Sequence, residues 1–348
     1  MELKNHSLTT PQAMKHNLHC FLIISSILLG CDNGKKNSSG AKPSLLEDAQ
    51  TYFEPLDLTN VPDKNDPKVV LGKEIFFDKR FSKDYSTSCN SCHDMAKFGV
   101  DNLAASHGTD GALTGRNSPT VLNVSGHIAQ FWDGRAKTLR DQIRMPMLAL
   151  GEMSMPDEAA ILERLNDGDK YKIMFAGLYA DGITLENMSD AVASFIESFT
   201  FPSKFDKFLN GEEELNDAAL RGLSQFIDKG CVDCHAGQLF GGEEFEKFGI
   251  YYDYWRFTVS DHLDSGVYKL TKDPDDLFVF KVPSLRNSRV TYPYFHDGSV
   301  NDLNQAIIIM GKTQLDVEIS KSEAADIAEF LNTLTTEFPD QDIVASSK

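Results

Sequence analysis

Hydrophobic positions along this chain recur at helical spacing. Between residues 322 and 334, small and aliphatic side chains fall near one face of a helix: Ala324, Ile327, Ala328 and Leu331. Comparable patterns predict further helices over 66–77, 137–149, 156–165, 187–200 and 216–229. Strict alternation of apolar and polar residues, which is typical of half-buried strands, is weak throughout. The pattern therefore predicts an all-α protein.

Residues with a preference for helix starts support two of these boundaries. Asp66 can cap the first helix, with Pro67 at its first helical position, and Ser322 is placed to cap the last. Two other segments look irregular. Residues 101–119 are rich in Gly, Ser, Thr and Asn, and residues 240–271 contain a cluster of aromatic side chains. Long loops in compact domains are often functional.

The N-terminal segment predicts export. A short apolar run over residues 20–29 follows Lys15; it is too short for a membrane span, which needs roughly 20 residues, but suits a secretory signal. The run ends in Leu28-Leu29-Gly30-Cys31, which looks like a bacterial lipobox with Cys31 as the lipidated residue. The alternative is a plain secretory signal in which Cys31 is incidental.

The rest of the chain divides into a tether and two halves. We assign residues 1–30 to a lipoprotein signal peptide and residues 31–44, rich in Gly, Ser, Asn and Lys, to a flexible tether. Residues 45–203 and 204–348 are expected to form an N-terminal and a C-terminal domain. The length of 348 residues suits two domains of ordinary size.

Charge narrows the range of partners. The composition is that of an ordinary globular protein, and the formal net charge is −18. Phosphates would repel such a chain, so we expect no nucleic acid. The charge favours a partner with a positive face, although a solvated surface without a role explains it equally well.

Four of the six cysteines form two identical motifs. Cys89-Asn90-Ser91-Cys92-His93 and Cys231-Val232-Asp233-Cys234-His235 both read C-x-x-C-H, the attachment site of c-type haem. Two thiols add across the vinyl groups of one porphyrin, so they must lie on one short turn, and the adjacent His binds the iron. Zinc half-sites and redox pairs also use C-x-x-C, but paired zinc half-sites usually lie closer together. The motifs therefore predict two covalently bound haems.

Longer strings around these motifs resemble a known family. They read FWDGRAKTLRDQ and GEM after the first motif, and FKVPSLRNSRVTYPYFHDGSVNDLNQAIIIMGKTQL after the second. The chain is similar over nearly its whole length from Val69 to Leu334 to the bacterial di-haem cytochrome c peroxidases. The resemblance implies two cytochrome c-like domains, with a peroxidatic haem in the first and an electron-transfer haem in the second.

The resemblance also implies roles for single residues. Met310 matches the second axial ligand of the C-terminal haem, although a methionine in an Ile-rich stretch is by default a core residue. Glu152 matches the catalytic carboxylate of the peroxide site, and Gln142 matches a neighbouring amide. Trp132 matches an aromatic residue between the haems, and a buried core tryptophan is the alternative.

Two further features follow from the resemblance. Asn117, Thr291 and Pro293 match a calcium site between the domains, where a plain turn without metal is the alternative. Many members carry a distal His on the resting peroxidatic haem. Here that position falls on Thr109, and His107 precedes it by two residues. Either the loop lets His107 bind, or this haem is open at rest; we favour the open form.

The resemblance implies an enzyme that reduces hydrogen peroxide to water with electrons from a small soluble donor such as cytochrome c. The alternatives are a di-haem oxidase that modifies another protein, in which Tyr replaces the Met ligand, and a non-enzymatic di-haem electron carrier. We expect a periplasmic or cell-envelope location in a Gram-negative bacterium, with the membrane contacted only through the lipid anchor. A homodimer is compatible with the resemblance, but no segment indicates its interface.

Overall fold

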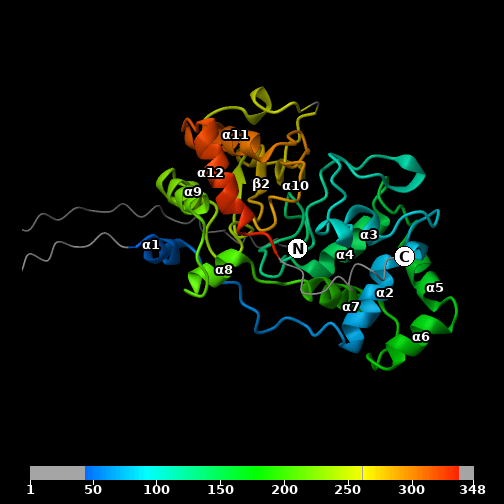
Figure 1. Ribbon diagram of the computed structural model, residues 1–348. Coiled ribbons are helices and arrows are strands. Elements are labelled where there is room, and N and C mark those ends of the chain that lie inside the picture. The colour runs from blue at the N-terminus through cyan, green and yellow to red at the C-terminus, as the bar shows by residue number, and fades with distance from the viewer. Residues whose placement is uncertain (1–43, 261, 337–348) are drawn as a thin grey trace, which may run out of the picture. The chain divides into compact units, whose positions relative to one another are not determined.

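A computed structural model describes residues 44–260 and 262–336, and these residues are mainly helical (Figure 1). The predicted signal, Cys31 and the tether up to residue 43 lie outside the described part. The α-helices are α1 (Leu45–Tyr52), α2 (Pro67–Phe77), α3 (Cys89–Cys92), α4 (Leu139–Leu148), α5 (Glu158–Asn166), α6 (Asp169–Ala176), α7 (Leu185–Glu197), α8 (Lys204–Leu209), α9 (Asp217–Asp228), α10 (Tyr268–Thr271), α11 (Leu303–Leu315) and α12 (Lys321–Asn332).

Short 3-10 turns and one small sheet complete the described structure. The turns are η1 (Lys79–Phe81), η2 (Met95–Lys97), η3 (Thr109–Gly111), η4 (Cys231–Asp233), η5 (Tyr254–Arg256) and η6 (Pro274–Asp276). Strands β1 (Phe245–Lys247) and β2 (Val279–Lys281) pair antiparallel, with Phe245 opposite Lys281. The predicted all-α fold is confirmed in its mainly helical character, whereas the small sheet was not expected.

Helix caps explain where the predicted helices begin. Asp66 caps α2, its side chain accepting a hydrogen bond from the backbone N–H of Lys68 at 2.8 Å, with Pro67 at the first helical position as predicted. The prediction that Ser322 caps the last helix is wrong. Ser320 caps α12 instead, because it forms a reciprocal capping box with Glu323 that satisfies two backbone N–H groups.

Six of the α-helices had no prediction: α1, α3, α6, α8, α10 and α11. Helix α11 shows the reason. Its sequence LNQAIIIMGKTQL has a run of isoleucines, so apolar residues surround the helix instead of marking one stripe. Such a segment is recognised only when packing buries it from several sides. The small sheet was missed because strands of three residues are too short to show alternation.

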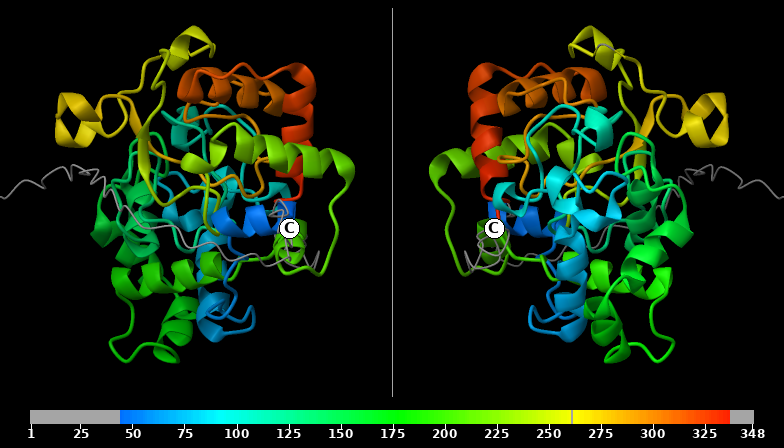
Figure 2. Two further views of the ribbon diagram at one scale, coloured as in Figure 1. Left: turned by 90° about the vertical axis from the view of Figure 1, so that its left-hand side faces the viewer. Right: turned by 90° about the vertical axis from the view of Figure 1, so that its right-hand side faces the viewer.

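Two large apolar clusters organise the described residues. The first contains residues of α2, α4, α5, α6 and α7, and the second contains residues of α1, α8, α9, α11 and α12. In Figure 1 the two groups of helices are separate, with α5, α6 and α7 in green on one side and α9, α11 and α12 on the other. Figure 2 shows the yellow segment around residue 260 on the same side of the molecule as the orange and red helices. One apolar cluster thus accompanies each C-x-x-C-H motif.

Helix α1 falls within the predicted N-terminal domain (residues 45–203), but it packs with the second apolar cluster. Ala49 and Phe53 belong to the second cluster, and the Phe53 ring stacks on Phe240 with centroids 4.5 Å apart. The first described helix therefore packs with the C-terminal half, although it precedes the N-terminal half in sequence.

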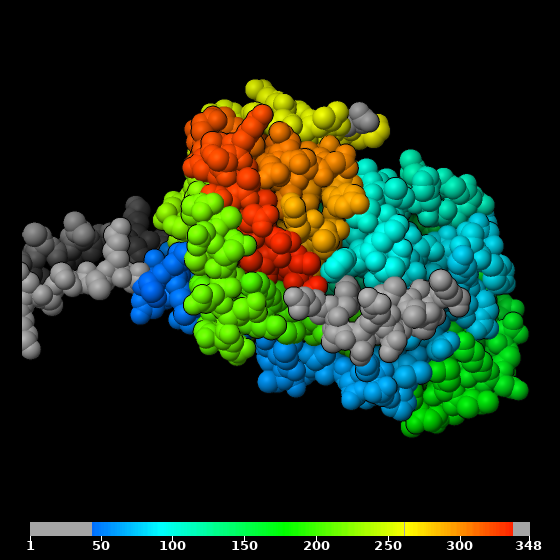
Figure 3. Space-filling model, in the orientation of Figure 1, coloured from blue at the N-terminus to red at the C-terminus, as the bar shows by residue number. Residues whose placement is uncertain are grey.

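Backbone hydrogen bonds join the two halves directly. The N–H of Asn117 donates to the carbonyl of His296 at 2.8 Å, and the Asn102 amide donates to the carbonyl of Tyr292 at 2.8 Å. Arg116 adds an ion pair with Asp264. In Figure 3 the orange and cyan surfaces of these regions adjoin without a gap. No helix in the described ranges has the length and apolar character needed to cross a bilayer.

Candidate functional site

The first C-x-x-C-H motif forms one helical turn. Helix α3 spans Cys89–Cys92, and its end residue His93 donates its backbone N–H to the carbonyl of Cys89 at 2.9 Å. Ser88 and Ser91 close a capping box at the start of the turn. This geometry places both thiols on one short turn, as attachment to a single porphyrin requires.

The imidazole of His93 is oriented by backbone carbonyls. Its Nδ1 lies 3.0 Å from the carbonyl of Pro119 and 3.3 Å from that of Gly99. Burial lowers the pKa of His93, so the ring is neutral at pH 7 and Nδ1 carries the proton that it donates. Nε2 is then the nitrogen whose lone pair is available to iron.

The second motif has the same arrangement on a 3-10 turn. His235 donates its backbone N–H to Cys231 at 3.0 Å, and its Nδ1 donates to the carbonyl of Phe240 at 2.8 Å. Burial lowers the pKa of His235 as well. Gly241 has a φ of +121°, and a Cβ there would lie 2.3 Å from the carbonyl oxygen of Pro283. Only glycine lets the chain pass this close behind the histidine.

The thiols do not have the character of a zinc or redox site. Burial raises the pKa of Cys89 to about 12 and that of Cys92 to about 11. Cys231 and Cys234 are raised to about 11 and about 12. Reactive or metal-binding cysteines need a thiolate at neutral pH. Among the described residues no cluster of three His, Cys, Asp or Glu could hold a metal ion. The raised pKa values disfavour a reactive redox pair, and the absence of a third metal-binding side chain beside either pair of thiols in the described ranges disfavours a zinc site.

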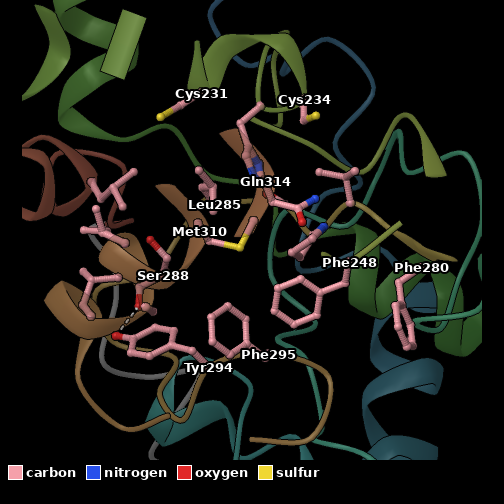
Figure 4. Close-up of a pocket in the computed structure, with 18 of the residues that line it drawn as sticks. Cys231, Cys234, Phe248, Phe280, Leu285, Ser288, Tyr294, Phe295, Met310 and Gln314 are labelled. Carbon is pink, nitrogen blue, oxygen red and sulfur yellow. Dashed lines mark hydrogen bonds between the residues drawn. The ribbon is translucent and has the colours of Figure 1, made fainter. Parts of the chain in front are cut away.

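An apolar cavity of about 240 Å³ extends from the second motif to Met310. Figure 4 shows the Met310 sulfur in this space, with Cys231 and Cys234 on one side and aromatic rings, among them Tyr294 and Phe295, on another. Helix α11 carries Met310 and begins at Asp302, whose side chain caps it. The structure thus brings together four of the predicted haem-binding side chains: Cys231, Cys234, His235 and Met310.

The donor set of this cavity fits a haem. Two thiols, an imidazole with Nε2 available and a thioether face a space that is otherwise largely apolar, which is what covalent attachment with His and Met ligation requires. The first motif supplies the same thiols and imidazole, without a methionine among the residues predicted to serve it. The residues present therefore fit one c-type haem at each motif.

Glu152 lies near the first motif. Its backbone carbonyl accepts a hydrogen bond from Thr109 N–H at 2.8 Å, and its negative charge contributes to the raised pKa of Cys92. Burial raises the pKa of the Glu152 carboxyl, while the positive charge of Arg135 acts against this rise. Gln142 is half-buried on α4, the helix that leads to the segment carrying Glu152.

The predicted calcium residues and Trp132 meet at the same cavity. Asn117, Thr291, Pro293 and Trp132 all contribute to its lining. The Trp132 indole N–H donates to the carbonyl of Asn117 at 2.9 Å. The Asn117 amide nitrogen donates to the carbonyl of Leu103 at 2.8 Å, which leaves its side-chain oxygen as an acceptor. Pro293 follows a cis peptide bond.

His107 is exposed. It pairs with Leu113 in an isolated antiparallel bridge. The neighbouring Thr109 is buried, and its hydroxyl bonds to that of Ser154 at 2.7 Å. These bonds attach the loop to the segment that carries Glu152.

Several residues of the site had no prediction. The carbonyls of Pro119 and Phe240 orient the two histidines, and the buried Lys281 bonds to the half-buried His127 beside the cavity. Every residue has a backbone carbonyl that can accept a hydrogen bond, whatever its side chain. The sequence therefore could not single out Pro119 or Phe240. Lys281 lies in the FKVPSLRN segment, where a basic residue within an apolar stretch could have indicated a buried charge.

Fold and motifs together define a mainly helical protein with two c-type haem attachment sites. A family profile described as di-haem cytochrome c peroxidase matches residues 66–214. The cytochrome c551 peroxidase of Nitrosomonas europaea is 40% identical over 285 residues, covering 80% of this chain and 83% of that protein. The cytochrome c551 peroxidase of Pseudomonas aeruginosa is 33% identical over 306 residues, covering 85% and 88%.

A solved structure supports the same relationship. A MauG-like protein associated with microbial copper homeostasis superposes with a TM-score of 0.71 at 28% identity, covering 84% of this chain and 95% of that one. The chain therefore belongs to the bacterial di-haem cytochrome c peroxidase family, as the sequence resemblance indicated. Membership implies two c-type haems.

Proposed function

We propose that this protein reduces hydrogen peroxide to water at the haem held by Cys89, Cys92 and His93. Electrons reach that haem through the second one, held by Cys231, Cys234, His235 and Met310. Each turnover consumes one peroxide, two electrons and two protons and yields two waters. The observation that carries the proposal is the asymmetry of the two sites, because the methionine-bearing cavity belongs to one motif and the half-buried acid Glu152 to the other.

When bound, the haem held by the first motif would supply an iron for peroxide chemistry, and the haem held by the second motif would supply electrons. The protein's part is to move protons. Glu152 would take a proton from one peroxide oxygen and return it to the other, which leaves as water. Its raised pKa suits a group that must both accept and release a proton near neutral pH. Gln142 donates a hydrogen bond that orients the peroxide.

Trp132 serves as the contact between the two sites. It lines the methionine-bearing cavity and bonds to Asn117, and the nearby Pro119 accepts from His93. A short stretch of chain thereby links the histidine of the first site to the wall of the second. A small soluble protein such as a reduced cytochrome c, presenting a basic face to this acidic chain, is the proposed donor.

The first site is proposed to be open at rest. Exposure of His107 and the bonds that attach its loop to the Glu152 segment support this form over a His107-ligated one. No reductive activation step is then needed.

Calcium and the cell envelope complete the proposal. The free side-chain oxygen of Asn117 and the carbonyls of Thr291 and Pro293 would hold one calcium ion, with water filling the rest. The chain is proposed to be exported to the periplasm and lipidated at Cys31. Mass spectrometry of the mature N-terminus tests this: an acylated Cys31 supports it, and an unmodified Cys31 contradicts it.

The protein-modifying oxidase remains the second candidate, because the nearest tyrosine also faces the cavity. Tyr294 donates its hydroxyl to the carbonyl of Ser288 at 3.0 Å, and burial raises its pKa to about 12. A protonated phenol already engaged elsewhere is a poor iron ligand. Tyr292 is 46% exposed. These features support Met310 as the ligand and the peroxidase over the oxidase.

The decisive experiment replaces Glu152 by Gln, which removes the proton-transfer group and keeps the shape. Peroxidase turnover should fall by about 10²–10⁴-fold with both haems retained. Glu158→Gln, at an exposed carboxyl on α5, is the matched control and should keep full activity. Full turnover by Glu152→Gln with two haems per chain would falsify the proton-transfer role.

A further inference from the structure

Lys281 is a buried cation beside the methionine-bearing cavity. It ends strand β2, is 8% exposed and contributes to the cavity lining. Its backbone N–H donates to the carbonyl of Trp132 at 2.8 Å, which fixes the strand against the residue assigned to contact both sites. Lys281 is therefore held in place within the described structure and is not a solvated side chain.

The only side-chain partner recorded for Lys281 among the described residues is a histidine. Its Nζ donates to Nδ1 of His127 at 3.1 Å. Burial and the lysine charge lower the pKa of His127 to about 3, so the ring is neutral and accepts this bond. Burial lowers the pKa of Lys281 itself to about 8, with no carboxylate acting against it. The ammonium is thus still largely charged at pH 7 and lacks an anion.

The neighbouring residues keep the pair together. Gly242 has a φ of +83°, and a Cβ there would lie 2.5 Å from Cδ2 of His127. The Gly242 N–H donates to Val282 at 2.7 Å, and its carbonyl accepts from Ile128 at 2.9 Å. These bonds join the chain after His127 to the chain after Lys281.

The acid in the adjacent strand is not positioned as the missing anion. Lys281 lies opposite Phe245, whereas Glu246 lies opposite Phe280. Successive side chains of a strand alternate between the two faces, so Glu246 and Lys281 start from different faces of the sheet; Glu246 also lines the cavity, but no carboxylate acts on the pKa of Lys281. The other basic residue in the cavity lining, Arg286, is already bonded to Asp206 by two hydrogen bonds.

A buried charge without a partner is costly, and such charges are normally paired. A haem brings two propionate carboxylates into its pocket. We propose that Lys281, supported by His127, binds a propionate of the C-terminal haem and raises the reduction potential of that haem. The positive charge favours the reduced form, because reduction removes one positive charge from the iron. Lys281 is therefore a positioning residue that acts on the haem potential without touching the iron.

This inference rests on the proposed haem occupation, which is tested separately by counting haems in the parent protein. The main variant is Lys281→Gln, whose amide can still donate to His127 while the charge is lost. Lys281→Arg keeps the charge. Lys247→Gln is the matched control, because Lys247 lies in the same sheet on β1 and is exposed.

The measurement is a spectroelectrochemical titration of both haems in the full-length protein. Lys281→Gln should lower the midpoint potential of the methionine-ligated haem by several times the shift seen for Lys247→Gln, and Lys281→Arg should stay near the parent. A shift no larger than that of Lys247→Gln, or a larger shift at the other haem, overturns the assignment. Because the readout is a potential, it remains valid even if Glu152 proves not to be catalytic.

A second variant covers the case in which Lys281→Gln does not assemble. Lys281→Met combined with His127→Phe replaces the pair by apolar groups of similar size, an exchange that buried polar pairs often tolerate. Its methionine-ligated haem should again have a lower potential than the parent. An unchanged potential in this double variant overturns the proposal.

Discussion

The two C-x-x-C-H regions share their local geometry and differ in what faces them. In each, a short turn carries two half-buried cysteines, and a backbone carbonyl orients a neutral histidine through Nδ1. The second region faces α11 and an apolar cavity that contains Met310. The first lies near Glu152 and an irregular loop bonded to the same segment. The same attachment motif therefore lies in two different surroundings, and residues distant in sequence provide the difference.

Replacing the Met310 thioether tests the difference between the two C-x-x-C-H regions most strongly. Met310→His supplies a stronger electron donor, which stabilises Fe(III). The potential of the C-terminal haem should fall by a substantial part of the roughly 0.8 V that axial ligands span, as measured by spectroelectrochemistry. Met174→His, on α6 at the edge of the first apolar cluster, is the control. Unchanged potentials in Met310→His would show that Met310 is a core residue.

Calcium removal tests whether the two regions depend on each other. Chelation should release one ion per chain and reduce donor-driven turnover several-fold, because Asn117 also bonds to Trp132 between the sites. Asn117→Ala should bind calcium more weakly by isothermal titration, whereas Asn60→Ala, on an exposed turn, should not. Full activity of a calcium-free protein would mean that this segment is a plain turn.

The pH dependence of turnover reports on the acid of the first region alone. Because burial raises the pKa of Glu152, activity that needs its deprotonated form should be lost as the pH falls through that raised value. The acid limb of kcat/KM for peroxide should therefore lie above the ordinary glutamate pKa of about 4.3. The reduction potential of the C-terminal haem should not change with pH over the range of this acid limb. A limb at the ordinary value would assign the proton transfer to another group.

The smallest effect is expected at His107. Because this side chain is exposed, His107→Ala should leave the electron paramagnetic resonance spectrum of the oxidised protein unchanged, with a high-spin signal at rest. Low-spin signals for both haems in the parent, one of which becomes high-spin in His107→Ala, would instead identify His107 as a distal ligand.

Local signals explain which parts of the fold could be predicted. Helix α2 begins at Pro67 as expected, because an acidic cap and a proline act within one turn. The start of α12 was misplaced, because Ser320 and Ser322 are both capable caps and only the reciprocal bond with Glu323 distinguishes them. The sequence of helix α1 does not indicate that the helix packs with the second cluster, because that contact depends on Phe240, which is distant in the chain.

The sequence by itself determined the chemistry of attachment and the family. Both C-x-x-C-H motifs place thiols and imidazole within one turn, and that geometry requires only neighbouring residues. The tertiary structure decided the surroundings of each site. It brought Met310 to the second motif, placed Glu152 near the first and buried Lys281 beside His127 without an anion. These arrangements depend on packing between segments far apart in the chain, which no local pattern of residues encodes.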